Sequence, residues 1–362
     1  MKEIKKIVLT GGPCAGKTTA FSKINEEITK NGYKVLFLQE TATELINSGF
    51  NANTCKNLLE FQTMIAKLQL YKEQLFLEFA KNMPYDKILV VCDRGVPDNK
   101  AFLGQKDYNK LLKILNKTEI QVRDNYDAVF HLCSCAKGAE KYYSLNNNSA
   151  RTETLEQARE SDDKIISAYT GHPHLRIIDN STNFEDKMKR LIEEIRVLLG
   201  VPKPYEIERK YLIEMPDIKQ LENNPNCKKV EVVQTYLKSK NNEEVRIRQR
   251  GEGESFIFTK TIKKRISHLK RIEIEEKITK DEYLSLLLFA DTKKNQIHKT
   301  RYCLIYLNQY FEIDIYPFWD KTAIMEIELN DENQEIKFPQ FIKIIKEVTD
   351  ELEYSNSHLA KK

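Results

Sequence analysis

The sequence predicts two domains of different class: an α/β domain with a parallel sheet, then an antiparallel eight-stranded β-barrel with flanking helices. The chain has 362 residues, which is more than one hydrophobic core usually serves. Residues 1–200 alternate between continuous apolar strands and helices, as in a parallel sheet covered on both faces. In the following residues the apolar pattern has a period of two, which favours antiparallel strands.

The first domain, residues 1–200, is expected to hold five short apolar strands. These are predicted at 6–10, 34–38, 88–92, 128–132 and 175–178. Helices are predicted at 17–30, 57–82 and 184–199. Residues 201–204 contain Pro202 and Pro204 and follow Gly200, so they are expected to form a stiff linker.

The second domain, residues 205–354, is expected to form the barrel. Its eight strands are predicted at 205–213, 230–237, 245–250, 256–262, 269–278, 300–307, 310–316 and 323–329. Two helices are predicted at 281–290 and 339–351. Residues 355–362 are expected to be a flexible, frayed tail.

The composition restricts the class of protein. Hydrophobic residues make up 41% and charged residues 31% of the chain, which is typical of a charge-rich globular protein. A formal net charge of +4 is small for this length and gives no strong nucleic-acid signal. Seven cysteines without a C-x-x-C pair indicate reduced thiols, and no apolar run is long enough for a transmembrane segment. We therefore expect a cytoplasmic location.

A phosphate-binding loop follows the first predicted strand. The pattern G-x-x-x-x-G-K-T lies between that strand and a helix, which is the structural context that the motif requires. Lys17 is expected to reach the outer phosphates of ATP or GTP, and Thr18 to bind Mg²⁺. The residues predicted to contact the nucleotide are Gly11, Gly12, Pro13, Cys14, Ala15, Gly16, Lys17, Thr18 and Thr19.

Two short motifs follow the second and third strands. Glu40 and the pair Asp93-Arg94 lie at the carboxyl edge of the expected sheet, beside the loop. With the loop, they resemble the deoxynucleoside and ribosylnicotinamide kinases, a branch of the P-loop proteins. The resemblance implies that Glu40 is the general base, that Asp93 supports Mg²⁺ or the acceptor, and that Arg94 steadies the transferring phosphate. A helix-start carboxylate and a surface ion pair are the simpler explanations.

Two arginines follow the fourth strand. Arg151 and Arg159 are eight residues apart, and kinases of this class carry a lid there whose arginines cover the γ-phosphate. A solvated helix laced with charges explains them equally well.

The second domain carries charged pairs with a spacing of two. Glu206-x-Glu208-x-Lys210 opens the series, and three E-x-E pairs recur in it. Residues two apart share one face of a strand, so these strands have a charged face and an apolar face. A barrel with a polar, ligand-filled interior explains the pattern, and the alternative is a sheet whose charged face lies in water.

This pattern resembles the CYTH superfamily, the triphosphate tunnel metalloenzymes. The resemblance implies a tunnel that binds inorganic or organic triphosphates and hydrolyses them with Mg²⁺, or with Mn²⁺ instead. The implied triphosphate ligands are Lys210, Arg246, Arg248, Lys260, Arg271 and Arg301. The implied metal ligands are Glu206, Glu208, Asp314, Glu326 and Glu328, together with Thr18 and Asp93 in the first domain.

The combination resembles the arrangement in the TRPL translocation defect protein family, in which a P-loop domain is fused to a CYTH domain. Three functions remain open. The first is a nucleotide-binding protein with a kinase-like NTPase domain and a triphosphate-hydrolysing tunnel. The second is a small-molecule or nucleoside kinase whose tunnel senses phosphate. The third is a trafficking or regulatory module that responds to GTP or acidic phospholipid.

Overall fold

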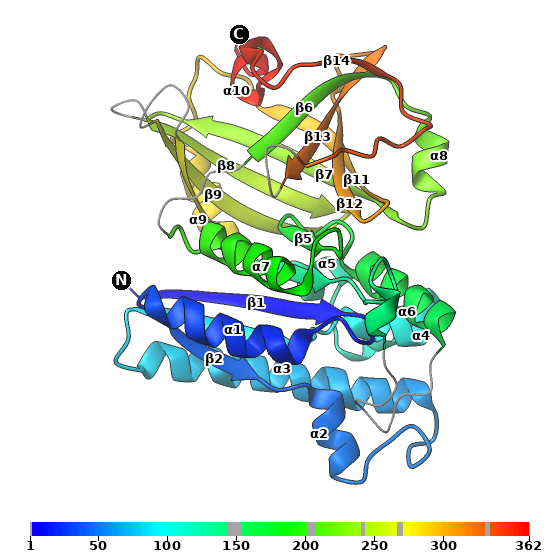
Figure 1. Cartoon of the computed structure of the whole chain (residues 1–362). Coiled ribbons are helices and arrows are strands. Elements are labelled where there is room, and N and C mark those ends of the chain that lie inside the picture. The colour runs from blue at the N-terminus through cyan, green and yellow to red at the C-terminus, as the bar shows by residue number, and fades with distance from the viewer. Residues whose placement is uncertain are drawn as a thin grey trace. The chain divides into compact units, whose positions relative to one another are not determined.

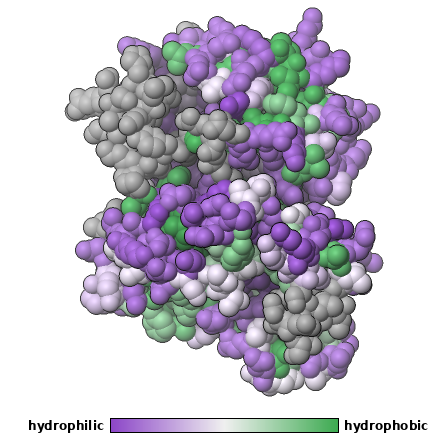
Figure 2. Space-filling view, viewed as in Figure 1, coloured by the Kyte–Doolittle hydropathy of each residue, from purple (hydrophilic) through white to green (hydrophobic). Residues whose placement is uncertain are grey.

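The computed structural model describes residues 2–143, 154–201, 207–239, 243–265, 271–329 and 334–361. The chain divides into two compact units, Met1–Leu199 and Gly200–Lys362. Each unit has its own sheet (Figure 1). On the face shown in Figure 2, hydrophilic side chains predominate in both units and hydrophobic side chains form small separate patches. Within the described residues, no helix is long and apolar enough to cross a membrane.

The first unit is built on a five-stranded sheet with the order β2-β3-β1-β4-β5, and every pairing in it is parallel. The strands are β1 (Glu3–Gly11), β2 (Lys34–Leu38), β3 (Lys87–Asp93), β4 (Ala128–Leu132) and β5 (Leu175–Ile178). Residues 88–92 are fully buried, because a central strand of such a sheet is covered on both faces. The predicted parallel α/β fold is confirmed.

Helices cover both faces of this sheet (Figure 1). They are α1 (Lys17–Lys30), α2 (Thr41–Asn47), α3 (Leu58–Asn82), α4 (Asp98–Ile114), α5 (Glu119–Arg123), α6 (Leu155–Tyr169) and α7 (Phe184–Leu198), with a 3-10 turn at Glu140–Tyr142. α1 packs against α7, while α4 packs against α3 and α6. α6 begins with a capping box in which Thr154 and Gln157 satisfy each other's backbone N–H groups.

The second unit is built on a nine-stranded antiparallel sheet with the order β10-β9-β8-β7-β11-β12-β13-β6-β14. The strands are β6 (Ile207–Glu214), β7 (Cys227–Leu237), β8 (Glu243–Glu252), β9 (Ser255–Arg265), β10 (Arg271–Ile278), β11 (Ile297–Tyr306), β12 (Gln309–Ile315), β13 (Thr322–Leu329) and β14 (Ile344–Glu347). The helices are α8 (Ile218–Glu222), α9 (Lys280–Leu287) and α10 (Asn356–Leu359), with a 3-10 turn at Leu352–Tyr354. The predicted antiparallel class is confirmed, and all eight predicted strands are present.

The ninth strand replaces a predicted helix. Residues 339–351 were expected to be helical, but β14 pairs with β6 and the backbone N–H of Val348 bonds to the carbonyl of Lys210 at 2.7 Å. β6 would otherwise present an unpaired edge, and Ile344 and Ile345 are β-branched residues that suit a strand.

The expected frayed tail is also ordered. Residues 356–359 form α10, and Ala360 is fully buried in a cluster with Tyr236, Ile297 and Val348. The prediction failed because the tail is held by tertiary contacts that no local pattern reveals.

Candidate functional site

The loop between β1 and α1 is the first site. It ends at Gly16, whose φ of 91° lies in the left-handed region, and no side chain caps the start of α1. The first turn of α1 also holds no acidic residue. The backbone N–H groups of the first turn of α1 and the positive end of its dipole are therefore not neutralised by a side chain of the helix. Such a helix start attracts an anion such as phosphate.

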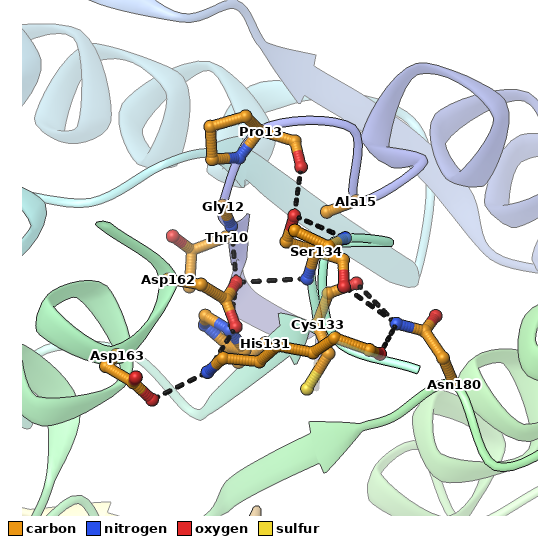
Figure 3. Close-up of polar contacts among 12 residues, drawn as sticks. Thr10, Gly12, Pro13, Ala15, His131, Cys133, Ser134, Asp162, Asp163 and Asn180 are labelled. Atoms are coloured by element: carbon orange, nitrogen blue, oxygen red, sulfur yellow. Dashed lines mark hydrogen bonds and ion pairs between the residues drawn. The ribbon is translucent and has the colours of Figure 1, made fainter. Parts of the chain in front are cut away.

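Asp162 of α6 fixes this loop to the end of β4 (Figure 3). Its Oδ1 accepts hydrogen bonds from the backbone N–H groups of Gly12 at 2.8 Å and Ser134 at 3.1 Å. The carboxylate also contacts His131 Nε2 at 3.0 Å and Lys137 Nζ at 2.9 Å. A Cβ atom on Gly12 would lie 2.6 Å from Oδ1, so the contact requires glycine.

The charge of Asp162 is well supported although the side chain is fully buried. Burial alone would raise the pKa of Asp162, but His131 and Lys137 bring it well below its usual range. A carboxylate with this many donors stays ionised, and removing it would leave several buried donors without a partner.

The next three residues of the loop are anchored in the same way. Ser134 Oγ donates to the carbonyl of Pro13 at 2.5 Å, and Cys135 Sγ donates to the carbonyl of Cys14 at 3.0 Å. Lys187 Nζ of α7 donates to the carbonyl of Ala15 at 3.2 Å. Four consecutive residues of the loop are thus held by α6, α7 and the end of β4, which preorganises the loop for a ligand.

Charged side chains from the ends of β2 and β3 meet beside the loop. Arg94 donates from Nε to Glu40 Oε1 at 2.6 Å and from Nη1 to Asp98 Oδ1 at 2.9 Å. Burial alone would lower the pKa of Arg94, but Asp98 and Glu40 raise it. Burial alone would raise the pKa of Glu40, but Arg94 and the Thr43 hydroxyl lower it. Glu40 is therefore ionised at neutral pH.

Lys17 and Asp93 lie at this same edge. No described residue forms an ion pair with Lys17, and burial and Arg94 lower its pKa against the effect of Asp93 and Glu40. Oδ1 of Asp93 is buried and accepts no hydrogen bond from any described residue. Burial raises the pKa of Asp93 to about 6, with Lys17 lowering it and Glu40 raising it.

The Asp93 oxygen suits a cation or a hydroxyl donor. A buried carboxylate oxygen normally has a partner, and Mg²⁺ prefers oxygen ligands. Thr18 and Thr19 lie in the first turn of α1 and are exposed. The Mg²⁺ site at Thr18 and Asp93 stays a prediction.

The two predicted lid arginines remain predictions. Arg151 lies outside the described residues. Arg159 of α6 donates to the carbonyl of Ala136 at 2.6 Å and to Glu140 at 3.0 Å, so its guanidinium holds the segment after β4.

His131, Cys133 and Asp162 form a buried group whose ligand atoms lie within 4.8 Å of one another. The donor set does not fit a metal, because the oxygens of Asp162 are already engaged by Gly12, Ser134 and Lys137. Burial and the charge of Asp162 also raise the pKa of Cys133, so its sulfur stays protonated.

The second site is a charged face of the nine-stranded sheet. Opposed residues of antiparallel strands share a face, and Arg301 lies opposite Asp314 while Glu326 lies opposite Lys210. Arg301 donates to Asp314 at 2.6 and 2.7 Å and to Glu326 at 2.9 Å, and it also pairs with Glu312. Lys210 Nζ lies 2.7 Å from Glu326 Oε1. These predicted ligands are therefore together in space.

In this network, burial and the neighbouring opposite charges shift the pKa values in opposite directions. Burial alone would lower the pKa of Arg301 and of Lys210, but Asp314 and Glu326 raise them. Burial alone would raise the pKa of Glu326, but Lys210 and Arg301 lower it. All of these groups are charged at neutral pH. Asp314 and Glu326 are paired with Lys210, Lys299 and Arg301. A metal ion bound to these two carboxylates would have to displace those cationic side chains.

Other predicted ligands extend the same face. Glu208 and Glu328 lie directly opposite each other on β6 and β13, and Lys210 Nζ lies 3.8 Å from Glu208 Oε1. Arg246 and Arg248 of β8 lie opposite Tyr236 and Gln234 of β7, on the face that carries Arg301. Glu206 lies outside the described residues, as does the side chain of Arg271 in β10.

Lys260 is a correction. It lies opposite Ile247, whose side chain is on the other face of β8 from Arg246 and Arg248. Its Nζ lies 3.1 Å from Glu276 on that second face. The charge pattern predicts Lys260 on the same face as the arginines, but it does not fix the register between strands.

Lys299 was missed by the sequence analysis. It is 6% exposed and pairs with Asp314 on the charged face. Burial and Arg301 lower its pKa to about 8, against the opposite effect of Asp314. Lys299 could have been predicted from its position two residues before Arg301, because residues two apart lie on the same face of a strand such as β11.

The comparisons with solved structures give likenesses with low TM-scores. The inorganic triphosphatase NE1496 is 26% identical, with 43% of this chain and 94% of that chain covered and a TM-score of 0.30. The PH1012 protein from Pyrococcus horikoshii OT3 is 19% identical, with 34% and 78% covered and a TM-score of 0.27. HpAC1 from Hippeastrum, described as a putative adenylyl cyclase with a dominant triphosphatase activity, is 13% identical, with 34% and 80% covered and a TM-score of 0.26. These scores are too low to assign an activity to the chain.

No curated protein matches the chain. A family model described as "AAA domain" matches residues 6–187, which include most of β1, the phosphate-binding loop, Glu40, Asp93 and the start of α7. The match covers half of the chain. The chain therefore belongs to this AAA domain family.

Proposed function

We propose that this chain is a Mg²⁺-dependent nucleotide-binding protein whose second unit binds and hydrolyses triphosphates. The observation that carries the proposal is the charged face of the second sheet. There, carboxylates and cations from neighbouring strands form one buried network instead of facing water. Burying so many charges is costly unless they bind each other or a ligand, and a charged ligand would exchange with these internal pairs on the same face.

The first unit would bind ATP or GTP through the loop. Its preorganised N–H groups and Lys17 would hold the phosphates, and Thr18 and Asp93 would hold Mg²⁺. Mg²⁺ supplies positive charge that offsets the charge of the phosphates. Arg94 is already fixed between Glu40 and Asp98, so it would meet the phosphate without a further loss of side-chain freedom.

In the second unit, cations on the charged face would bind the triphosphate. Lys210, Arg246, Arg248 and Arg301 supply the positive charge, and Arg271 belongs to the same predicted set. Glu206, Glu208 and Glu328 would hold Mg²⁺ or Mn²⁺, which polarises phosphoryl oxygens.

Lys299 is the best candidate for a base in hydrolysis. A buried lysine with a pKa of about 8 is partly neutral at pH 7 to 8, so it can accept a proton from an attacking water. Asp314 would keep the lysine in position, and Arg301 beside it would favour the neutral form.

Phosphate release by the full chain tests the proposal. We expect triphosphate hydrolysis with Mg²⁺ or Mn²⁺, and a loss on the order of 10²–10⁴ in Lys299→Arg, which keeps the charge but cannot act as a base. Triphosphate should still raise the melting temperature of that variant. If Lys299→Arg hydrolyses triphosphate like the wild type, the role of Lys299 is wrong. If no triphosphate is hydrolysed or bound, the proposal fails.

A kinase is the second candidate function, favoured by the ionised Glu40 beside the loop. A panel of nucleosides and vitamins with ATP or GTP, read by mass spectrometry, would find a phosphorylated acceptor. Glu40→Gln should then abolish transfer while the nucleotide still binds. Binding to vesicles of acidic phospholipid, with GTP or GDP, tests the regulatory function in the same preparation.

A further inference from the structure

Two cysteines from distant parts of the chain meet at the phosphate-binding loop. Cys14 lies inside the loop, and Cys135 follows β4. Cys135 Sγ donates to the carbonyl of Cys14 at 3.0 Å, so the Cys135 sulfur lies against the backbone of Cys14. Ser134 Oγ, next to Cys135, holds the carbonyl of Pro13 at 2.5 Å. The two segments are thus already fastened side by side.

The two thiols differ in access. Cys14 is partly exposed, whereas Cys135 is 9% exposed. Burial and the neighbouring Cys14 thiol raise the pKa of Cys135 to about 11, so Cys135 is protonated at neutral pH. A small oxidant therefore meets Cys14 first. Cys92, Cys133, Cys227 and Cys303 are buried, and Cys55 is partly exposed but contacts Met64 instead of a second cysteine.

We propose that Cys14 and Cys135 form a reversible disulfide when a peroxide oxidises the protein, and that this bond closes the loop to nucleotide. The Cys14 sulfur attacks the peroxide, the O–O bond breaks, and a sulfenic acid and one water form. The Cys135 sulfur then attacks the Cys14 sulfur, the S–O bond of the sulfenic acid breaks, and the hydroxyl leaves with the Cys135 thiol proton as a second water. Two thiols and one hydrogen peroxide give one disulfide and two waters, so atoms and electrons balance.

The effect on nucleotide follows from the loop geometry and rests on the proposed nucleotide binding. Cys14 has a φ of 55°, in the left-handed region that a residue with a side chain rarely adopts. A disulfide requires a narrow range of Cα and Cβ separations and a fixed dihedral angle. Forming the disulfide would replace the hydrogen bond from Cys135 Sγ to the Cys14 carbonyl with a covalent bond to the Cys14 side chain, and we expect this exchange to move the loop N–H groups that would hold phosphate.

Peptide mapping and nucleotide binding of the full chain, before and after treatment with hydrogen peroxide, test the inference. We expect a linked peptide pair that contains Cys14 and Cys135, a Kd for ATP or GTP that rises by at least about tenfold, and recovery of both with dithiothreitol. Cys135→Ser keeps a donor for the Cys14 carbonyl, so its reduced form should bind nucleotide like the wild type and lose its sensitivity to peroxide. Cys55→Ser is the matched control and should respond like the wild type.

Three results would overturn the inference: no linked pair after oxidation, a linked pair without a change in Kd, or a Cys135→Ser variant that is as sensitive as the wild type. The last result would mean that oxidation of Cys14 alone is sufficient. Failure of the reduced wild type to bind nucleotide would contradict the proposed function instead, and peptide mapping would still decide whether the disulfide forms.

Discussion

At the scale of single residues, Asp162 shows how a buried charge fixes the conformation of a loop. Its carboxylate holds Gly12, Ser134, His131 and Lys137 at once. The cost of burying the charge is offset only while all these donors remain in place. The function of the loop therefore depends on a residue 150 positions away in the chain.

Replacing Asp162 should make stability depend on pH in a defined direction. Asp162→Ala should destabilise the first unit by about 3–5 kcal/mol at pH 7, because it leaves the N–H groups of Gly12 and Ser134 without their buried acceptor, while Lys137 keeps its ion pair with Asp163. The folded pKa of Asp162 is lowered, so its contribution is present above the unfolded pKa of about 3.9 and is lost as the pH falls below it. Urea unfolding of the wild type and Asp162→Asn should therefore differ more at pH 7 than at pH 3. An equal difference in the free energy of unfolding at pH 7 and pH 3 would show that the charge of Asp162 does not contribute to stability.

Two cations on opposite faces of the second sheet provide a matched pair. Arg248→Ala should weaken triphosphate binding by roughly 10- to 100-fold, because a charge-assisted hydrogen bond contributes about 1.5–3 kcal/mol. Lys260→Ala removes the same formal charge from the other face and should leave the affinity nearly unchanged. Isothermal titration calorimetry with inorganic triphosphate measures both. Equal losses of triphosphate affinity in the two variants would mean that the face on which a cation lies does not decide whether it binds triphosphate.

At the scale of elements, β14 and α10 complete the second unit. β14 covers the edge of β6, which carries Glu208 and Lys210, and Ala360 after α10 packs with Val348 beside it. The strand that holds predicted ligands is thus supported by the last residues of the chain. A site on a supported strand is held more rigidly than one on an open edge.

Ala360→Glu tests this support. The substitution buries a carboxylate without a partner, so it should lower the free energy of unfolding of the second unit by more than about 2 kcal/mol. Lys361→Glu, at the next and exposed position, should cost less than about 0.5 kcal/mol. Thermal unfolding by circular dichroism compares the two. Similar melting temperatures would mean that α10 adds nothing to the stability of the sheet.

At the scale of the whole molecule, the chain divides into two compact units, and we propose a separate phosphate site in each. Each ligand should therefore stabilise one unit. A ligand at 100 times its Kd adds about 2.7 kcal/mol to the state that binds it. ATP or GTP with Mg²⁺ should raise the melting transition of the first unit, and triphosphate with Mg²⁺ or Mn²⁺ that of the second.

Lys17→Ala separates the two effects. It removes the cation aimed at the outer phosphates, so it should abolish the nucleotide-dependent shift and leave the triphosphate-dependent shift intact. Differential scanning calorimetry of the full chain resolves the two transitions. Loss of both shifts in Lys17→Ala would show that the sites act as one.

The sequence by itself determined the order of the two fold classes and most of the strands. Continuous apolar strands indicate a parallel sheet that is covered on both faces, whereas strands that alternate apolar and charged residues indicate an antiparallel sheet with one apolar and one charged face. It also placed the phosphate-binding loop, because a G-x-x-x-x-G-K-T pattern between a strand and a helix is a local feature. Its strand boundaries near Lys34–Leu38 and Ala128–Leu132 agree with the structure.

Only the tertiary structure decided which residues meet. Asp162 and Cys135 contact the loop from positions far along the chain, and no local pattern indicates such contacts. Lys260 was grouped with Arg246 and Arg248 because charge spacing within a strand says nothing of the register between strands, and a shift of one residue reverses the face. Residues 339–351 became a strand because β6 offers an edge to pair with, and that edge exists only once the sheet has formed.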